Sequence, residues 1–241
     1  MTRSHRFDHA AATYERFADI QREMAAWLAE WIPQERQGDA LEIAAGTGLF
    51  TDHLVPWEGP LIASDLSPNM VAAGKRRRPE VAWVIRDADT LGETQLDWIF
   101  SCSFLQWSDD PEALLRAWGK SLKPGGRLLA GFFVNGAIPE LHRLLGAHAP
   151  IQYRESEDWQ RIFGRAGFFV DGCDVRVEPR DYPNAIDLFR RLHKIGATRG
   201  PRLKTAAMRT LLRAYEAACP HPDGVIARWH FCRILAATKA R

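Results

Sequence analysis

Short apolar segments alternate with helix-like segments from residue 40 to residue 133, and this alternation constrains the fold more than any other feature. The apolar segments are predicted strands at residues 40–44, 60–64, 81–85, 96–102 and 127–133. Helices are predicted between them at residues 47–54, 67–78 and 111–122. Because strand alternates with helix through short connections, the pattern predicts a parallel sheet with helices on both faces.

The segments on either side of this region have a different pattern. Residues 8–31 are predicted to form one helix, because Tyr14, Phe17 and Trp27 belong to an apolar set that repeats near helical spacing. After Gly136 the regular alternation ends, and residues 137–165 are predicted to be helices and loops. The later predicted elements are strands at 170–177 and 229–237 and basic amphipathic helices at 185–196 and 203–218.

The chain is predicted to be one domain with three regions. Its 241 residues, of which 46% are hydrophobic, are enough for the core of one larger α/β domain. The regions are an N-terminal helical segment at 1–32, a strand-rich core at 38–135, and a region of helices and final strands at 136–241.

Charge and cysteine content exclude several classes of function. Lys plus Arg is 32 and Asp plus Glu is 30, so the net charge is only +2 and we expect no nucleic-acid partner. The four cysteines lack the close spacing of a zinc motif, so no metal site is predicted. We find no secretory signal and no apolar stretch that could span a bilayer, so a cytoplasmic protein without a membrane partner is expected.

A glycine-rich turn follows the first predicted strand. The sequence LEIAAGTGLF, residues 41–50, places Gly46 and Gly48 between this strand and the next helix. Glycine lacks a β-carbon, so the chain can turn sharply and let a ligand approach the backbone. The start of the helix adds free amide groups. The pattern indicates a cofactor cradle, although a Gly-x-Gly also occurs in turns that bind nothing.

Acidic residues at or near the ends of three consecutive strands favour the cofactor interpretation. Asp65 lies seventeen residues beyond Gly48, at the end of the second strand, where a carboxylate can accept hydrogen bonds from a ribose diol. Asp87, followed by Ala88, ends the third strand and can accept from an adenine amine. Glu42 lies in the first strand, just before the glycine turn.

A nicotinamide cofactor fits this turn poorly. Its usual motif is Gly-x-Gly-x-x-Gly, and residues 46–51 read Gly-Thr-Gly-Leu-Phe-Thr, without the last glycine. The carboxylate of Glu42 would also repel a pyrophosphate. A sulfonium cofactor that carries an α-amino group is positively charged, so Glu42 favours that class.

Four successive segments resemble the motifs of class I S-adenosylmethionine methyltransferases. They are LEIAAGTGLFT, ASDLSPNMV, DADTL and SCSFLQWSDDPEALLRAWGKSLKPGG. The resemblance implies S-adenosyl-L-methionine as the cofactor. It also implies an α/β, Rossmann-like doubly wound sheet, mostly parallel with a C-terminal antiparallel strand, helices on both faces and an N-terminal helical lid. Ala44 stands where the usual motif has its first glycine, which adds a methyl group near the methionine part of the cofactor.

Further segments resemble the malonyl-acyl-carrier-protein O-methyltransferases of biotin synthesis. They are FDHAAATYERFADIQ, FLQWSDDPEALL, NGAIPELHRLL and LFRRLHKIGAT, which lie between residues 7 and 198. The resemblance implies a substrate with a free carboxylate, either a small molecule or an acyl group on an acidic acyl carrier protein. The segment GAHAPIQYRESEDW matches that family less clearly.

The resemblance implies roles for individual residues. The predicted cofactor-binding residues are Gln21, Glu42, Ala44, Gly46, Gly48, Asp65, Leu66, Met70, Asp87, Ala88, Ser103 and Gln106. Tyr14 and His142 are the predicted catalytic residues. The Tyr14 hydroxyl would steer the substrate carboxylate or close the pocket, and His142 would donate a hydrogen bond to a carboxylate. Trp107 lies either beside the transferred methyl group or in the core.

Methyl transfer to a carboxylate requires little acid–base chemistry. A carboxyl pKa lies near 4, so the acceptor is already a nucleophile at neutral pH. The protein must therefore position the acceptor and exclude water. Guanidinium groups match carboxylate geometry, and the candidates for such a clamp are Arg143, Arg154, Arg190, Arg191 and Arg199.

The two predicted late helices and the segment between them are rich in basic residues. These are Arg190, Arg191, Lys194, Arg199, Arg202, Lys204, Arg209 and Arg213. These residues could bind an acidic acyl carrier protein, or they could simply lie on helix faces exposed to solvent. Two other functions stay open: methylation of another small carboxylate or a phenol, and a catalytically silent cofactor-binding protein, at which Ala44 hints.

Overall fold

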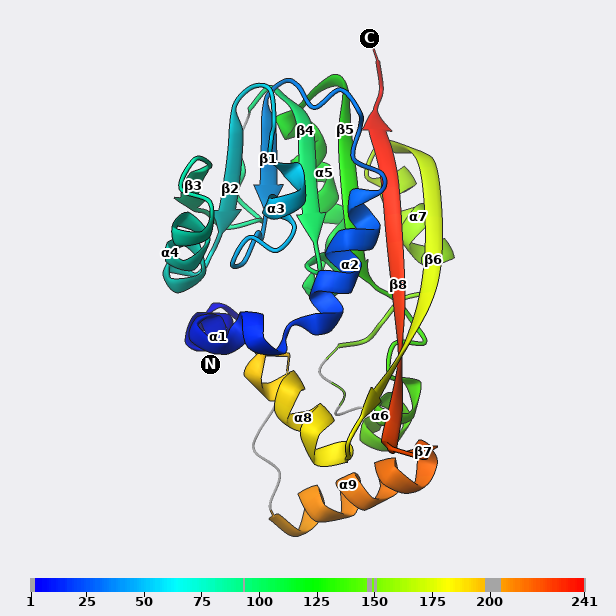
Figure 1. Cartoon of the computed structure of the whole chain (residues 1–241). Helices are drawn as coiled ribbons and strands as arrows, with labels where there is room; N and C mark the ends of the chain where they lie inside the picture. The colour runs from blue at the N-terminus through cyan, green and yellow to red at the C-terminus, as the bar shows by residue number, and fades with distance from the viewer. Residues whose placement is uncertain (1–2, 93, 147–148, 150, 198–204, 241) are drawn as a thin grey trace.

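The computed structural model contains an eight-stranded mixed sheet with helices around it (Figure 1). The structure describes every residue except 1–2, 93, 147–148, 150, 198–204 and 241. The strand order is β3-β2-β1-β4-β5-β8-β6, and β7 pairs with β8. The strands are β1 (Ala40–Ile43), β2 (Leu61–Asp65), β3 (Ala82–Ile85), β4 (Leu96–Cys102), β5 (Leu122–Phe133), β6 (Phe168–Tyr182), β7 (Pro220–His221) and β8 (Gly224–Thr238).

The first five strands are parallel, which confirms the sheet predicted from the alternating pattern. β1 pairs with β2 on one side and with β4 on the other. The chain therefore reverses its direction of travel through the sheet between β1 and β4. In doubly wound sheets a ligand binds at such a switch point, beyond the carboxyl ends of the strands.

The last strands are antiparallel and longer than predicted. β8 lies between β5 and β6 and is antiparallel to both. The sequence pattern predicted only residues 170–177 and 229–237 for these two strands. Each extends toward helices α8 and α9, where half-exposed and polar residues weaken the apolar signal. The two-residue strand β7 and the 3-10 turn η1 (Leu105–Trp107) were not predicted, because both are too short for a periodic pattern.

Helices pack against both faces of the sheet. α2 (Asp19–Ala29) and α3 (Thr51–Leu54) cover one face, where Leu28 and Phe50 pack with Phe100. α5 (Pro111–Ser121) and α7 (Ser156–Arg165) cover the other, where the buried Trp118 and Trp159 join the core. α4 (Pro68–Arg77) packs beside β3 at the parallel edge of the sheet.

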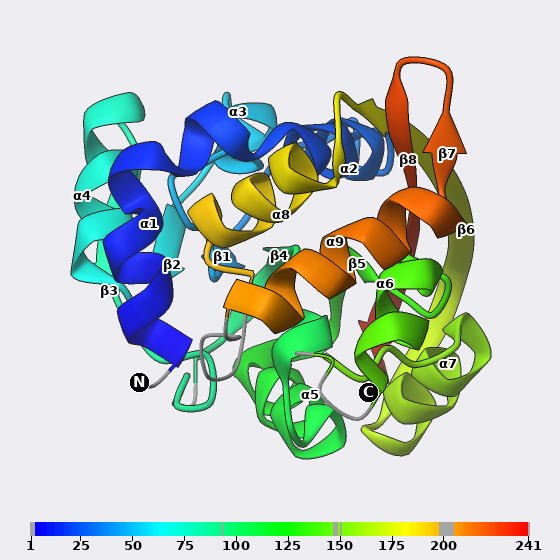
Figure 2. The same ribbon diagram turned by 90° about the horizontal axis from the view of Figure 1, so that it is seen from below.

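The remaining helices lie beyond the carboxyl ends of the parallel strands. Figure 2, seen from below, shows them across this end of the molecule. They are α1 (Arg3–Phe17), α6 (Pro139–Leu145), α8 (Ala185–Lys194) and α9 (Thr205–Ala218). A separate apolar cluster, which includes Leu141, Leu188 and Tyr215, joins α6, α8 and α9 to the lower part of β8. In the described part of the chain, no helix combines the length and apolar character needed to cross a membrane.

The predicted N-terminal helix is two helices. α1 begins at Arg3 and ends at Phe17, and α2 begins at Asp19. Ala18 separates them with a φ of −91° and a ψ of 39°, which is not helical, and its side chain is fully buried. Packing of this joint overrides the continuous helical pattern of the sequence, and the break turns α1 away from the sheet.

Two predicted element boundaries were also wrong. The helix expected from residue 47 begins at Thr51, because Gly46 and Gly48 have φ values of 58° and 92°, which no right-handed helix accepts. β5, predicted to begin at residue 127, begins at Leu122 directly after α5.

Candidate functional site

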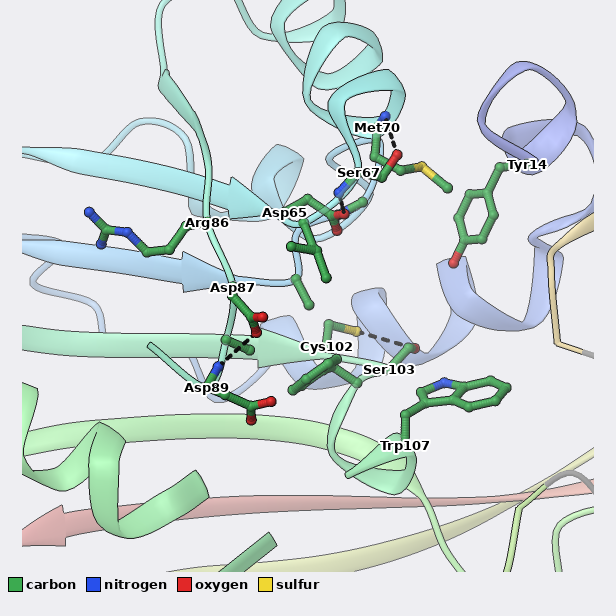
Figure 3. A pocket seen from close by; sticks show the side chains of 15 residues that line it. Tyr14, Asp65, Ser67, Met70, Arg86, Asp87, Asp89, Cys102, Ser103 and Trp107 are labelled. Carbon is green, nitrogen blue, oxygen red and sulfur yellow. Dashed lines mark hydrogen bonds between the residues drawn. The ribbon is translucent and has the colours of Figure 1, made fainter. Parts of the chain in front are cut away.

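A cavity of about 310 Å³ lies beyond the carboxyl ends of β1, β2, β3 and β4 (Figure 3). This volume is within the range of small-molecule and cofactor sites. Its lining comes from the loops that follow these strands and from Tyr14 on α1. The cavity is thus where the strand order reverses, as expected for a ligand site in such a sheet.

The turn after β1 supplies backbone to the cavity. Gly46 lines it with a φ of 58°, and the space where its Cβ would lie has no atom within 4 Å. Ala44 also lines the cavity and has a φ of 56°, a left-handed conformation that costs an alanine energy. A glycine is usual at this place because it adopts such a conformation without strain. Ala44 adopts the conformation at an energetic cost.

Asp65 fastens this turn to the next loop. Its Oδ2 accepts from the Gly46 amide at 2.9 Å, and its Oδ1 accepts from the Ser67 amide at 2.8 Å. Burial raises the pKa of this carboxyl, and the amide hydrogen bonds act in the opposite direction. A carboxylate has about four acceptor positions, so two amides leave capacity for a ribose diol.

The loop after β3 supplies a second acidic group. Asp87, Ala88 and Asp89 all line the cavity, and the Asp89 amide donates to Asp87 Oδ1 at 3.0 Å. Figure 3 shows Asp87 and Asp89 at the side of the cavity away from Tyr14. A carboxylate beside a backbone amide can pair with the donor and acceptor edge of an adenine.

The other end of the cavity is lined by Tyr14, Cys102, Ser103 and Trp107. Burial raises the pKa of Tyr14 far above its ordinary value, so its hydroxyl stays a hydrogen-bond donor at neutral pH. Burial also raises the pKa of Cys102 to about 12, so this sulfur stays a weakly nucleophilic thiol. The described residues at this end therefore offer neutral donors and an aromatic wall, and none of them is a general base.

Most of the predicted site residues come together in this cavity. The predicted residues that line it are Tyr14, Ala44, Gly46, Asp65, Leu66, Met70, Asp87, Ala88 and Ser103. Trp107, left open between site and core, lines it too. The lining residues that sequence reasoning missed are Ser67, Arg86, Asp89, Cys102 and Phe104. Each of these is a direct neighbour of a predicted residue, so extending each motif by one residue would have found them.

Glu42 does not line the cavity as the sequence suggested. Its side chain is buried beneath the glycine turn, and its Oε2 accepts from the Thr51 hydroxyl at 2.6 Å. Burial raises the pKa of Glu42 to about 8. Glu42 therefore carries a proton at neutral pH in this structure and supports the turn from below. Gly48 likewise lies outside the lining, packed near the Trp83 ring.

Gln21 and Gln106 also lie outside the lining, and both are buried. Among the described residues, the Oε1 atom of each has no hydrogen-bond partner, and neither has the Thr47 hydroxyl in the glycine turn. Buried polar atoms without partners are usually satisfied by a ligand or water. Within the cavity itself, Asp65 and Asp87 suit a nucleoside cofactor that bears positive charge, so the residues present fit S-adenosylmethionine.

His142, predicted to be catalytic, is not among the residues that line the cavity. His142 lies on α6, with its ring centroid 4.8 Å from that of Tyr153. Burial lowers its pKa, so the imidazole is neutral at pH 7. A catalytic role for His142 therefore stays a prediction.

None of the described candidates for an arginine clamp lines the cavity. Arg191 is held by Asp187 and Asp19, each at 2.7 Å, and Arg154 lies over the ring of Trp159. Arg143 and Arg190 do not line the cavity, and Arg199 is outside the described residues. Arg86 is the arginine found in the lining. Within the described ranges, no group of three or more His, Cys, Asp or Glu residues could hold a metal.

The chain is similar to known methyltransferases. Residues 41–130 match the family described as a methyltransferase domain. A malonyl-[acyl-carrier protein] O-methyltransferase from Hahella chejuensis is 29% identical, over 93% of this chain and 85% of that protein. The biotin biosynthesis bifunctional protein BioHC from Cellvibrio japonicus is 35% identical over 57% of this chain, which spans only 28% of that protein.

Solved structures share the fold. A SAM-dependent methyltransferase from Thermotoga maritima aligns with a TM-score of 0.62 and 19% identity, over 99% of this chain and 100% of that one. A phosphoethanolamine N-methyltransferase from Haemonchus contortus, in complex with S-adenosyl-L-methionine, aligns with a TM-score of 0.60 and 20% identity. That alignment covers 97% of this chain and 57% of the nematode protein. These likenesses confirm the Rossmann-like fold class.

Replacement of Asp65 by Ala is expected to weaken cofactor binding. The change removes a carboxylate that can accept from the ribose and that joins the loops after β1 and β2. Hydrogen bonds to charged groups contribute about 1.5–3 kcal/mol, so the dissociation constant should rise roughly 10- to 100-fold. Isothermal titration with S-adenosylhomocysteine measures it, with Asp65→Asn as a variant that keeps one acceptor oxygen. An unchanged constant for Asp65→Ala would place the adenosine elsewhere.

Replacement of Ala44 by Gly is expected to stabilise the protein. An alanine in the left-handed conformation costs about 1–2 kcal/mol, which glycine avoids. Glycine also gives the unfolded chain more freedom, and this offsets roughly 0.4–1 kcal/mol of the gain in stability. The free energy of unfolding, measured with urea, should therefore rise by about 0.5–1 kcal/mol. A lower stability of Ala44→Gly would show that the turn is not strained at this position.

The free energy of unfolding should depend on pH through Glu42. Its folded pKa of about 8 is above the ordinary value of 4.5, so its stabilising contribution is complete below 4.5 and is lost as pH rises to 8. Gln at this position cannot ionise. We therefore expect Glu42→Gln to gain stability relative to the wild type between pH 5 and pH 8, measured by urea unfolding without cofactor. Parallel pH profiles of the two proteins would contradict the buried, protonated state of Glu42.

Proposed function

We propose that the chain, an S-adenosylmethionine-dependent methyltransferase, methylates the free carboxylate of a malonyl group carried by an acyl carrier protein. The observation that carries this proposal is the similarity to a malonyl-[acyl-carrier protein] O-methyltransferase over 93% of the chain. The neutral, aromatic end of the cavity supports it, because a carboxylate acceptor needs no general base.

Polar groups of this chain would hold the cofactor. Asp65 would accept from the ribose hydroxyls, and Asp87 with the backbone of Ala88 would receive the base. The glycine turn would place backbone against the methionine part. When bound there, the cofactor supplies a methyl group on a positively charged sulfur. Everything else the protein does is to orient the acceptor and to exclude water.

Tyr14 is the residue best placed to orient the acceptor. It lines the end of the cavity opposite Asp87, and its hydroxyl keeps its proton. A neutral donor can hold one oxygen of a carboxylate while the other oxygen stays free to react. Trp107, on the same side, narrows the space available to the acceptor. His142 has no part in this scheme, since it lies on α6 outside the cavity lining.

A basic surface on α8 and α9 suits an acidic carrier protein. We define it by four exposed residues that the structure describes, Arg190, Lys194, Arg209 and Arg213. Arg190 makes only a long ion pair of 3.7 Å with Asp187. Arg191 is excluded, because two carboxylates already neutralise it. Charges of this kind steer an oppositely charged partner and raise its association rate.

Three acceptors distinguish the proposed activity from its alternatives. We expect methyl transfer from labelled cofactor to be most efficient with malonyl acyl carrier protein, weaker with malonyl coenzyme A and weakest with free malonate. Neutralising Arg190, Lys194, Arg209 and Arg213 together should raise KM for the carrier protein about three- to tenfold and leave coenzyme A methylation unchanged.

Lys75 and Arg76 provide the matched control. Both are exposed on α4, away from α8 and α9, so their replacement by Gln should leave KM unaltered. Transfer to a different carboxylate or a phenol, with none to malonyl compounds, would overturn the proposed substrate. Cofactor binding without transfer to any acceptor would instead support a catalytically silent protein.

A further inference from the structure

The helix that carries Tyr14 is attached to the cofactor loop by a carboxylate. Asp8 on α1 accepts from the Ser67 hydroxyl at 2.6 Å and from the Asn69 amide at 3.1 Å. Its other oxygen accepts from Asn69 Nδ2 at 2.9 Å. Asp8 thus faces the N-terminal turn of α4, where negative charge is favourable. These hydrogen bonds, chiefly that of the Ser67 hydroxyl, lower the pKa of Asp8, so this side chain is an ionised carboxylate at neutral pH.

Ser67 connects this contact to the cofactor site. Its backbone amide donates to Asp65, and its hydroxyl both donates to Asp8 and accepts from the Met70 amide at 3.1 Å. Ser67, Asp65 and Met70 all line the cavity. The position of α1 is therefore tied to the loop that would hold the ribose.

A second carboxylate attaches the other end of the same helix. Glu15 accepts from Arg77 Nη1 at 2.8 Å, and Arg77 Nε donates to Asp52 Oδ2 at 2.7 Å. Asp52 belongs to α3, which follows the glycine turn. Asp8 and Glu15 are seven residues apart, two helical turns, so both face α4. Tyr14 precedes Glu15 directly and faces the cavity.

The apolar contacts of α1 lie in its second half. Ala10 is buried there, and Tyr14 and Phe17 are partly buried against the apolar cluster that includes Leu188. The side of the helix that carries Asp8 and Glu15 contacts α4 through polar groups, and α1 ends at Phe17, next to the non-helical Ala18. Movement of α1 away from α4 therefore requires these polar contacts to break.

We propose that Asp8 and Glu15 are positioning residues that fasten α1 over the cavity, hold Tyr14 in place and limit the rate at which bound cofactor leaves. Departure of the ligand past Tyr14 requires α1 to move, and both contacts must break for that movement. The proposal rests on the cofactor site alone and is independent of the methyl acceptor.

The test measures dissociation of S-adenosylhomocysteine by stopped flow, with tryptophan fluorescence as the signal because Trp107 lines the cavity. We expect Asp8→Ala and Glu15→Gln each to raise the dissociation rate about three- to tenfold, and the double variant to exceed both. The Arg77–Glu15 pair is partly exposed and therefore screened by salt. The wild-type rate should rise with ionic strength more steeply than that of Glu15→Gln.

Arg78→Gln is the matched control. Arg78 bonds the same Asp52 at 2.6 Å and reaches Glu80, neither of which belongs to α1. Its replacement should leave the dissociation rate and its salt dependence within twofold of the wild type. Without ligand, Glu15→Gln and Arg78→Gln should have similar melting temperatures. Faster dissociation in Glu15→Gln alone would then reflect loss of the contact between α1 and α4, and not loss of stability. An unchanged rate in Glu15→Gln, or an equal increase in Arg78→Gln, would overturn the proposal.

Discussion

The site depends on one carboxylate, that of Asp65. It accepts from the backbone amides of Gly46 and Ser67 and so joins the loops after β1 and β2. Neither loop has regular structure where they meet, and each presents backbone groups that need partners. A buried carboxylate at the end of a rigid parallel strand satisfies both and still has acceptor capacity for a ligand. The same loops then fix Ser67, and through it Asp8 and the helix that carries Tyr14.

Among the described residues that line the cavity, carboxylates outnumber basic groups. The charged side chains there are Asp65, Asp87, Asp89 and Arg86, while Tyr14 and Cys102 stay neutral and Glu42 is protonated beneath the turn. A nucleoside ligand with positive charge complements the carboxylates, whereas they would repel a pyrophosphate. The acidic residues at the ends of β2 and β3 thus favour a positively charged nucleoside cofactor.

The parallel half of the sheet, its cavity and most of the lining could be predicted from sequence, because they depend on local patterns. Apolar strands followed by Gly46, Asp65 and Asp87 mark positions that a doubly wound sheet must bring together. The break at Ala18 could not be predicted, since packing, not propensity, bends the chain there. Glu42 and His142 do not line the cavity, although both were predicted site residues, because sequence shows residue type but not whether a side chain faces a cavity.

A crystal structure of the protein with S-adenosylhomocysteine tests the central claim most directly. The account predicts a nucleoside across the ends of β1, β2 and β3, with ribose hydroxyls within hydrogen-bond distance of Asp65 and the base beside Asp87 and Ala88. Tyr14 should cover the sulfur end, with α1 in contact with α4. A ligand bound at another place, or a cavity that stays filled with water at saturating ligand, would contradict it.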